Sequence, residues 1–226
     1  MNTGTTRDDL SAVETILPVS RETGERLEAY VALIRKWNKA DNLVGSSTLD
    51  TIWQRHIADS AQLVALFPES RRWLDLGSGG GLPAIVVAIL LAGQKGAAVH
   101  LVESNRRKCA FLRQAIRTTG APATVHEGRV EAVLADWQAP VDMVSARAFA
   151  PLSRLLDLAA PVMTLGVPGA FHKGQDFVRE IAETPQSWGC DLVKHDSRLG
   201  AGGVILEVRN LRRQSEDSPQ AAERSP

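Results

Sequence analysis

Glycines that alternate after a carboxylate mark the segment with the clearest chemistry. Asp75 is followed by Gly77, Gly79 and Gly81, which gives the pattern D-x-G-x-G-x-G directly after a short apolar run. Glycine allows a tight turn and lets a ligand reach backbone N–H groups without meeting a Cβ atom. Pro83 follows and is preorganised for a first helical turn. The segment therefore predicts an amide-lined cradle at the positive end of a helix, where a polar ligand binds.

The residues around these glycines limit the choice of ligand. A phosphate-binding loop needs Gly-Lys-Ser/Thr after its glycines, and residues 81–83 read Gly-Leu-Pro, which excludes nucleoside triphosphate hydrolysis. Gly79, Gly81 and Ala84 satisfy the dinucleotide pattern G-x-G-x-x-A loosely, so NAD stays open as a ligand. Glu103 ends the next apolar run, where an acidic side chain accepts hydrogen bonds from two ribose hydroxyls. NAD and S-adenosylmethionine both carry such a ribose.

Two features favour S-adenosylmethionine. The position of Asp75 before the first glycine and a strand pattern that ends in a hairpin are both similar to class I S-adenosylmethionine-dependent methyltransferases. The NAD alternative lacks its chemistry, because Ile34 stands where a Tyr-x-x-x-Lys pair starting at Tyr30 would need lysine. Two alternatives stay open: a methyltransferase acting on a small molecule, and an NAD-binding Rossmann-like module.

The elements that position this cradle follow from hydrophobic spacing. Apolar residues three and four apart predict helices over 25–38 and 49–67. From residue 72, short apolar runs alternate with helical patterns, which predicts a parallel sheet with helices on both faces. The last two runs, CDLVKH and GVILEV, leave no room for a helix between them and predict an antiparallel hairpin. We therefore expect an α/β, Rossmann-like fold with a seven-stranded, mostly parallel sheet and an N-terminal helical cap.

Composition sets the remaining bounds. We expect a helical region at 1–67 packed on a methyltransferase domain at 68–210, with a disordered tail at 211–226 that is poor in apolar residues. Lys plus Arg equals Asp plus Glu at 26 each, so a nucleic acid would be held by a local basic patch. Cys109 and Cys190 stand far apart, which argues against a zinc site or disulfide framework. With no signal segment and no run of ~20 apolar residues, we expect a cytoplasmic protein.

The sequence lacks the groups that two common kinds of methyl acceptor require, and this narrows the choice of acceptor. Amino-group methylation commonly uses an Asp/Asn-Pro-Pro-aromatic stretch after the fourth strand, whereas residues 145–152 read SARAFAPL. Methylation of pyrimidine C5 usually needs a cysteine nucleophile, and Cys109 lies in an apolar helical run that predicts a core position. Guanine N7 carries a free lone pair and no proton, so in-line positioning suffices for its methylation.

Six segments in consistent order, from about residue 30 to 210, resemble the glucose-inhibited division B family, the bacterial guanine-N7 methyltransferases of small-subunit ribosomal RNA. They are WNKADNLVGSS (37–47), WQRHIADSAQL (53–63), WLDLGSGGGLPAIVVAI (73–89), HEGRVEAV (126–133), VSARAFAPL (144–152) and FHKGQ (171–175). The resemblance implies that S-adenosylmethionine methylates one guanine in the 530 loop of 16S ribosomal RNA, as free RNA or within the small subunit. We expect a monomer without a metal.

The resemblance also implies cofactor contacts at five positions, namely Gly77, Leu82, Val130, Glu131 and Arg147. We add Gly79 from the glycine pattern and Glu103 from its strand position, where a family member may carry the shorter aspartate. Ala84 departs from the frequent glycine after Leu-Pro. No residue is assigned as a catalytic acid, base or nucleophile.

Arg147 stands beside the expected transfer site at the end of the fourth strand. N7 must be free for attack, so a contact to cofactor or phosphate is preferred over a contact to the guanine edge, with a structural ion pair as the alternative. His56 borders an apolar stripe, so packing or capping rivals catalysis for it. Basic residues that could reach RNA are Arg35, Lys36, Lys39, Arg55, His56 and Lys173, extended by Arg106, Arg107, Lys108, Arg113 and Arg117. Trp37 and Trp53 occupy stripe positions and predict core packing.

Overall fold

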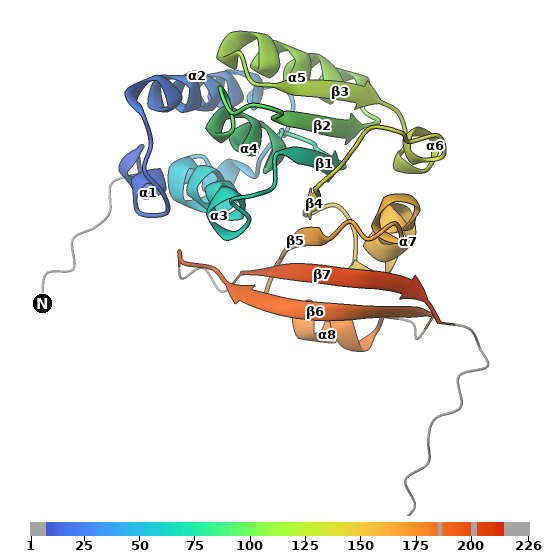
Figure 1. Cartoon of the computed structure of the whole chain (residues 1–226). Helices are drawn as coiled ribbons and strands as arrows, with labels where there is room; N and C mark the ends of the chain where they lie inside the picture. Colours follow the sequence, from blue (N-terminus) through green and yellow to red (C-terminus); the bar gives the residue numbers. More distant parts are fainter. Residues whose placement is uncertain (1–7, 185–186, 200–202, 215–226) are drawn as a thin grey trace, which may run out of the picture.

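One mixed sheet organises the chain. The computed structural model describes residues 8–184, 187–199 and 203–214, and within these ranges seven strands form the order β3-β2-β1-β4-β5-β7-β6 (Figure 1). The strands are β1 (Arg72–Leu76), β2 (Ala98–Glu103), β3 (Ala123–Glu127), β4 (Met143–Arg147), β5 (Gly169–Lys173), β6 (Trp188–Asp196) and β7 (Val204–Arg213). The predicted fold class is confirmed.

The sheet reverses its direction of winding beside β1. β1 pairs in parallel with β2 on one side and with β4 on the other, so Asp75 lies between Leu101 and Ser145. In open α/β sheets, ligands bind in the crevice beyond the carboxyl ends of the strands at such a point. The predicted antiparallel hairpin of β6 and β7 is confirmed, and β7 also pairs antiparallel with β5.

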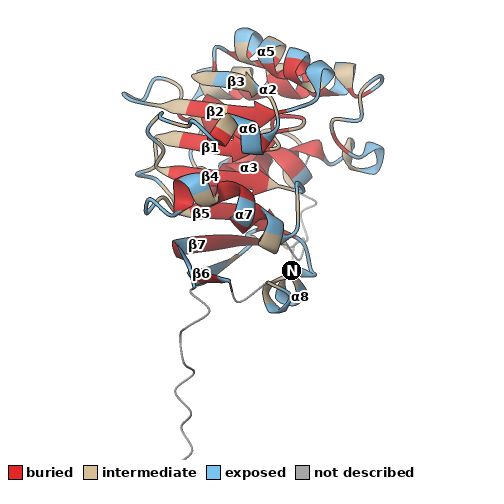
Figure 2. Ribbon diagram, turned by 90° about the vertical axis from the view of Figure 1, so that its right-hand side faces the viewer, coloured by how far each residue is buried: buried red, intermediate tan, exposed pale blue. Residues whose placement is uncertain are grey.

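Helices cover both faces of the sheet (Figure 1). On one side lie α2, α3, α4 and α5, and on the other α6, α7 and α8. Their bounds are α2 (Arg21–Trp37), α3 (Asp59–Leu66), α4 (Ala84–Leu90), α5 (Arg106–Thr119), α6 (Val130–Leu134), α7 (Leu152–Met163) and α8 (Phe177–Ala182). Buried residues follow the strands and the sheet-facing sides of the helices (Figure 2). The core therefore has one layer on each side of the sheet.

The N-terminal helices share a core layer with the sheet. In α2, Leu27, Tyr30 and Ile34 are fully buried and belong to the same cluster as Ile85 of α4 and Phe111 of α5. This arrangement follows from the predicted stripe, whose spacing places these side chains along one side of the helix. The N-terminal region thus packs directly over the segment that follows β1.

Several local features differ from the predicted elements. The helix expected over 49–67 is a π-helix, η2 (Trp53–Ala58), continued by α3, with the 3-10 turn η1 (Ser46–Thr48) before it. The short helix α1 (Ser11–Glu14) was not predicted. β7 continues to Arg213 with Leu211 buried, so the expected tail boundary at 211 falls inside a strand, because Leu211 adds to the core. Residues 215–226 of that tail lie outside the described residues.

The described helices include none with the length and apolar character of a membrane span.

Candidate active site

The three alternating glycines after β1 differ in why the structure needs glycine at each position. Gly77, Gly79 and Gly81 have φ angles of +67°, +54° and +82°, a region that side chains disfavour. A Cβ on Gly77 would lie 2.1 Å from the Phe149 ring, and one on Gly81 would lie 2.5 Å from Ile85. A Cβ on Gly79 would meet only a backbone oxygen at 3.8 Å. Packing therefore requires glycine at 77 and 81, whereas the loop is open at 79.

This loop is held from α2. The Tyr30 hydroxyl donates a hydrogen bond of 2.5 Å to the carbonyl oxygen of Gly80. Tyr30 is fully buried, and burial raises the pKa of its hydroxyl well above the usual value, so it stays a donor. The N-terminal region thereby fixes the position of the glycine loop.

A cavity of about 590 Å³ opens at this loop, beyond the carboxyl ends of β1, β2, β3 and β4. We call it the glycine-loop cavity. Its lining includes all seven predicted cofactor contacts, which are Gly77, Gly79, Leu82, Glu103, Val130, Glu131 and Arg147. Residues 43–45 and His56 of the N-terminal region complete the wall. The sequence separation between these groups is large, and the fold brings them to one site.

Glu103 bridges two chain segments at this cavity. Its carboxylate accepts hydrogen bonds from the backbone N–H of Gly79 at 2.9 Å and of Asn105 at 2.8 Å. Each carboxylate oxygen has a further lone pair. The side chain is buried yet lines the cavity, so it can receive hydroxyl donors from a ligand.

Asp75 lies beneath the loop with one oxygen engaged. Its Oδ1 accepts a hydrogen bond of 2.7 Å from the Ser145 hydroxyl, while Oδ2 is buried without a hydrogen-bond partner among the described residues. Burial raises the pKa of the Asp75 carboxyl to about 7. The group therefore changes protonation near neutral pH instead of staying ionised.

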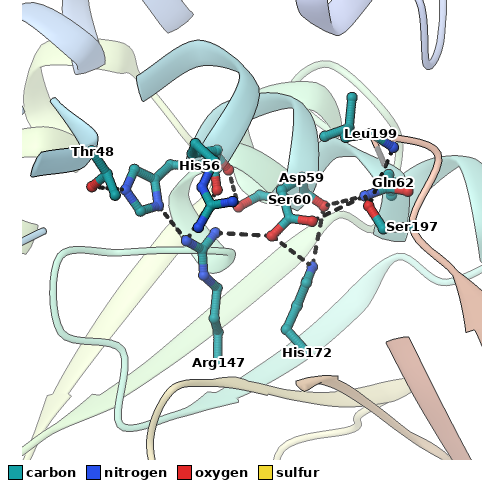
Figure 3. Close-up of polar contacts among 10 residues, drawn as sticks. Thr48, His56, Asp59, Ser60, Gln62, Arg147, His172, Ser197 and Leu199 are labelled. Atoms are coloured by element: carbon teal, nitrogen blue, oxygen red, sulfur yellow. Dashed lines mark hydrogen bonds and ion pairs between the residues drawn. The ribbon is translucent and has the colours of Figure 1, made fainter. Parts of the chain in front are cut away.

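Arg147 joins the end of β4 to the N-terminal helices (Figure 3). Its Nη1 lies 3.2 Å from Asp59 Oδ2, and its Nη2 contacts His56 Nδ1 and the carbonyl oxygen of Arg55. His56 Nε2 lies 2.7 Å from the Thr48 hydroxyl, which donates to Gly45 O. Since arginine only donates, His56 accepts at Nδ1 and carries its proton on Nε2.

The cluster of Arg147, Asp59, His56 and Thr48, which we call the hub, keeps His56 neutral. Burial, followed by the charges of Arg147 and Arg55, lowers the pKa of His56 to about 3. Both ring nitrogens are engaged, with Arg147 on one side and Thr48 on the other. His56 therefore transmits the position of Arg147 to residues 45–48 and is not free to accept a proton from a substrate.

Asp59 extends the hub to the other half of the sheet (Figure 3). Its backbone oxygen lies 3.1 Å from His172 Nε2, and its Oδ1 accepts a hydrogen bond of 3.1 Å from Gln62. Gln62 in turn contacts Ser197 and the N–H of Arg198, in the turn after β6. The N-terminal helices are thus tied to β4, β5 and the hairpin at once.

A second cavity of about 590 Å³ adjoins the first. Residues 147–150 line both cavities, whereas Lys173, Glu180 and Leu155 line only the second. Phe149, 38 % exposed, follows Ala148, whose φ of +48° is unusual for a side-chain-bearing residue. The two cavities therefore meet at Phe149.

Comparison with known proteins decides the family. The model of the GidB family, rRNA small subunit methyltransferase G, matches residues 23–204. The chain belongs to this family. Relatives named ribosomal RNA small subunit methyltransferase G include one from Parvibaculum lavamentivorans, 50 % identical over 90 % of both chains. Another, from Bradyrhizobium sp. (strain ORS 278), is 46 % identical over 92 % of this chain and 93 % of the relative.

Solved structures show the same fold as this methyltransferase G family member. The O-methyltransferase from Bacillus cereus in complex with SAH matches with a TM-score of 0.54 at 15 % identity, over 89 % of this chain and 96 % of that one. TomG, an O-methyltransferase from Streptomyces achromogenes, matches with a TM-score of 0.51 at 16 % identity, over 89 % and 95 %. At these identities the likeness concerns the fold alone.

The predicted RNA contacts fall into two groups in this methyltransferase. Arg35, Lys36, Lys39 and Arg55 are exposed. His56 and Lys173 are buried, so the expectation of a surface contact to phosphate is corrected for both. Both ring nitrogens of His56 are engaged, and the Lys173 ammonium is 2.6 Å from the Glu180 carboxylate. The arginines of α5 are exposed and partly neutralised, with Arg107 on Asp41 and Arg113 on Glu127.

The predicted core position is confirmed for Trp53, whereas Trp37 is half-buried and packs against the core. Trp53 is buried, and Trp37 packs edge-on against Phe111 with its indole N–H on Gln114.

Several residues that line the two cavities were not predicted from the sequence. Phe149, Glu180 and residues 43–45 line the cavities without having been singled out. Phe149 stands two residues after Arg147, and its aromatic ring beside a predicted site was a usable signal. The other positions depend on contacts between distant segments, which a single sequence does not display.

Proposed function

We propose that this protein transfers a methyl group from S-adenosylmethionine to N7 of a guanine in the 530 loop of 16S ribosomal RNA. The observation that carries the proposal is the pair of adjoining cavities that share residues 147–150, one built on the glycine loop and one beyond it. Membership of the methyltransferase G family supports ribosomal RNA of the small subunit as the substrate. The arrangement suits one molecule that donates a group and a second that receives it.

The glycine-loop cavity fits S-adenosylmethionine. The open position at Gly79 lets a ligand approach the backbone, and the Glu103 carboxylate has lone pairs for the ribose hydroxyls. Leu82 and Val130 supply buried apolar walls suited to the adenine, with Glu131 at the rim. When bound, S-adenosylmethionine supplies an electrophilic methyl group on its sulfonium. The protein's residues hold and orient this group.

The groups near the cavities support an acceptor that carries no proton to be removed. Cys109 is fully buried and burial raises the pKa of its thiol, which disfavours a thiolate nucleophile. His56 is engaged at both ring nitrogens. Guanine N7 presents a lone pair directly, so alignment with the methyl group is the main requirement. Arg147, held by Asp59 and His56, positions residues 147–150, which would lie between S-adenosylmethionine in one cavity and the acceptor in the other.

Exposed basic residues supply the surface for RNA in this proposal. Arg35 and Lys36 end α2, and Arg55 lies on η2 beside the second cavity. The chain has zero formal net charge, so local cations of this kind would have to supply the attraction for RNA. We propose that these basic residues contact RNA phosphates and that the protein acts as a monomer in the cytoplasm.

The test is a deletion and complementation experiment. Small-subunit RNA from a strain without this protein is analysed for N7-methylguanine by mass spectrometry of nuclease fragments. We expect the modification to be absent from the 530 loop and to return when the purified protein and S-adenosylmethionine are added. Full modification in the deletion strain would show that the assigned reaction is wrong.

A further inference from the structure

An ion pair between a buried lysine and a half-buried glutamate lies on the wall of the second cavity. Lys173 at the end of β5 and Glu180 on α8 are joined by a contact of 2.6 Å between Nζ and Oε2. The side chains are 6 % and 22 % exposed, and both residues line the cavity. The pair therefore offers one positive and one negative group side by side to an occupant of that cavity.

Part of the hydrogen-bonding capacity of this pair is unused. Lys173 Nζ donates to Ala150 O at 2.9 Å and to Glu180, and Glu180 Oε2 also accepts from the N–H of Leu152 at 2.8 Å. Among the described residues, the third N–H of Lys173 has no acceptor and Glu180 Oε1 has no donor. A ligand can therefore use one donor on Lys173 and, next to it, the two lone pairs of Glu180 Oε1.

Guanine matches this pattern and adenine opposes it. Guanine presents the O6 acceptor beside the N1–H and N2–H donors, whereas adenine presents the N6–H donor beside the N1 acceptor. One carboxylate oxygen that accepts from both N1–H and N2–H, next to an ammonium that faces O6, satisfies guanine. Uracil offers a similar O4 acceptor beside its N3–H donor, but it has the O2 acceptor where guanine has N2–H. N7 lies on the other side of O6 from N1, so a guanine held this way keeps N7 free.

Phe149 adds an aromatic face between the two cavities. Its ring packs against Gly77 of the glycine loop, and the residue lines both cavities while staying 38 % exposed. Proteins that read unpaired bases commonly stack them on aromatic rings. A base stacked here stands at the boundary with the glycine-loop cavity.

We propose that the second cavity is the guanine-reading pocket, in which Glu180 accepts N1–H and N2–H, Lys173 donates to O6, and Phe149 stacks on the base. This inference rests on the proposed function and names the specificity residues for it. The target guanine leaves its stack to enter the pocket, as bases do in other enzymes that modify them. Specificity for guanine then comes from the Lys173–Glu180 pair and not from Arg147.

A purely structural role for Glu180 has to be separated from base reading. Glu180 joins α8 to the first turn of α7 through Leu152, so its loss alone would lower activity. The decisive quantity is therefore a ratio of kcat/KM values for two RNAs. One carries guanosine at the target position and the other carries inosine, which lacks only the N2 amino group.

The wild-type protein is measured first, without any substitution. We expect inosine to lower kcat/KM by about 10- to 100-fold, the effect of losing a hydrogen bond to a charged acceptor. Equal rates on the two RNAs would overturn the reading of N2–H by Glu180, whatever the variants show.

Glu180→Gln is then compared with Glu183→Gln, a substitution on the exposed residue that follows the end of α8. In Glu180→Gln the amide presents a donor toward the base, so we expect the guanosine-to-inosine ratio to fall to about threefold or less. Glu183→Gln should keep the wild-type ratio. Binding of S-adenosylhomocysteine, measured by calorimetry, should be unchanged in both. Equal slowing on the two RNAs in Glu180→Gln would overturn the proposal.

The two proposals fail in different ways. If the wild type methylates N7 in neither RNA, the proposed function is wrong. If it methylates guanosine and Glu180→Gln leaves the ratio unchanged, the function stands and the pocket assignment is wrong.

Discussion

Arg147 of β4 and Asp59 of α3 form an ion pair, with 3.2 Å between Nη1 and Oδ2, on side chains that are 17 % and 24 % exposed. The pair joins the N-terminal helices to the carboxyl end of the sheet at the wall between the two cavities. In a partly buried setting such a pair fixes geometry, because breaking it leaves an uncompensated charge. The helical cap is therefore part of the site.

Arg147→Ala should reduce methyl transfer strongly while the fold is retained. The substitution removes the contacts to Asp59, His56 and the Arg55 carbonyl, so the wall between the cavities loses its position. We expect kcat/KM to fall by about 100-fold, as small displacements at a reacting centre do. Arg21→Ala, on a side chain that is 92 % exposed, is the matched control. Unchanged activity in Arg147→Ala would show that the side chain is dispensable.

Gly77→Ala should weaken cofactor binding through a steric conflict. The new Cβ would lie 2.1 Å from the Phe149 ring, and φ at Gly77 is +67°. Gly93→Ala carries a similar backbone penalty at φ +83°, of about 1 kcal/mol, and its Cβ meets nothing within 4 Å. We expect calorimetry to show binding of S-adenosylmethionine weakened more than about 10-fold in Gly77→Ala only. Similar binding by both variants would contradict the packing argument.

Asp75 should make the stability of the protein depend on pH. Burial raises the pKa of this carboxyl from its usual value of 3.8 to about 7, so the folded state binds a proton more tightly than the unfolded state. Its contribution to stability is full below pH 4 and is lost as the pH rises through about 7.

Asp75→Asn removes this contribution and keeps an acceptor for Ser145. Between pH 4.5 and 7, the wild-type free energy of unfolding should fall relative to the variant, at up to about 1.4 kcal/mol per pH unit. Urea unfolding across this range measures the difference. Parallel stability curves would contradict the raised pKa.

The proposed contacts of Arg35 and Lys36 to RNA phosphates predict a dependence of RNA binding on salt. Replacing both Arg35 and Lys36 by alanine should weaken binding and reduce the slope of log K against log salt by about 1.4, for two phosphate contacts to a single strand. Lys95→Ala, an exposed lysine between α4 and β2, should leave the slope unchanged. Filter binding at several salt concentrations measures it. A wild-type slope in the double variant would show that Arg35 and Lys36 do not contact RNA phosphates.

Hydrophobic spacing along the sequence predicted the strands and helices whose formation depends mainly on neighbouring residues. The short apolar runs predicted from residue 72 include β1 and β5, because a buried strand needs a short apolar stretch with clear ends. The π-helical segment of η2 was predicted as part of a regular helix, since its apolar spacing resembles that of an α-helix. The insertion of β7 between β5 and β6 depends on pairing across the sheet, which hydrophobic spacing does not encode.

Cavity-lining residues could be predicted where the residue type itself indicates ligand binding. The glycines and Glu103 were found because bare backbone and a carboxylate at strand ends point to a ligand. Partners that meet only in the folded chain were not found, such as Phe149 on Gly77 and Tyr30 on Gly80. Lys173 was placed on the surface because its ion pair with Glu180 requires α8 to fold back beside β5.

The central claim is that the glycine-loop cavity holds the methyl donor and aims its methyl group at the second cavity. A crystal structure with bound S-adenosylhomocysteine tests it most directly. We predict the ribose hydroxyls on Glu103, the adenine beside Leu82 and Val130, and the sulfur facing the boundary at Phe149. A product bound outside this cavity, or a sulfur turned away from Phe149, would contradict the account.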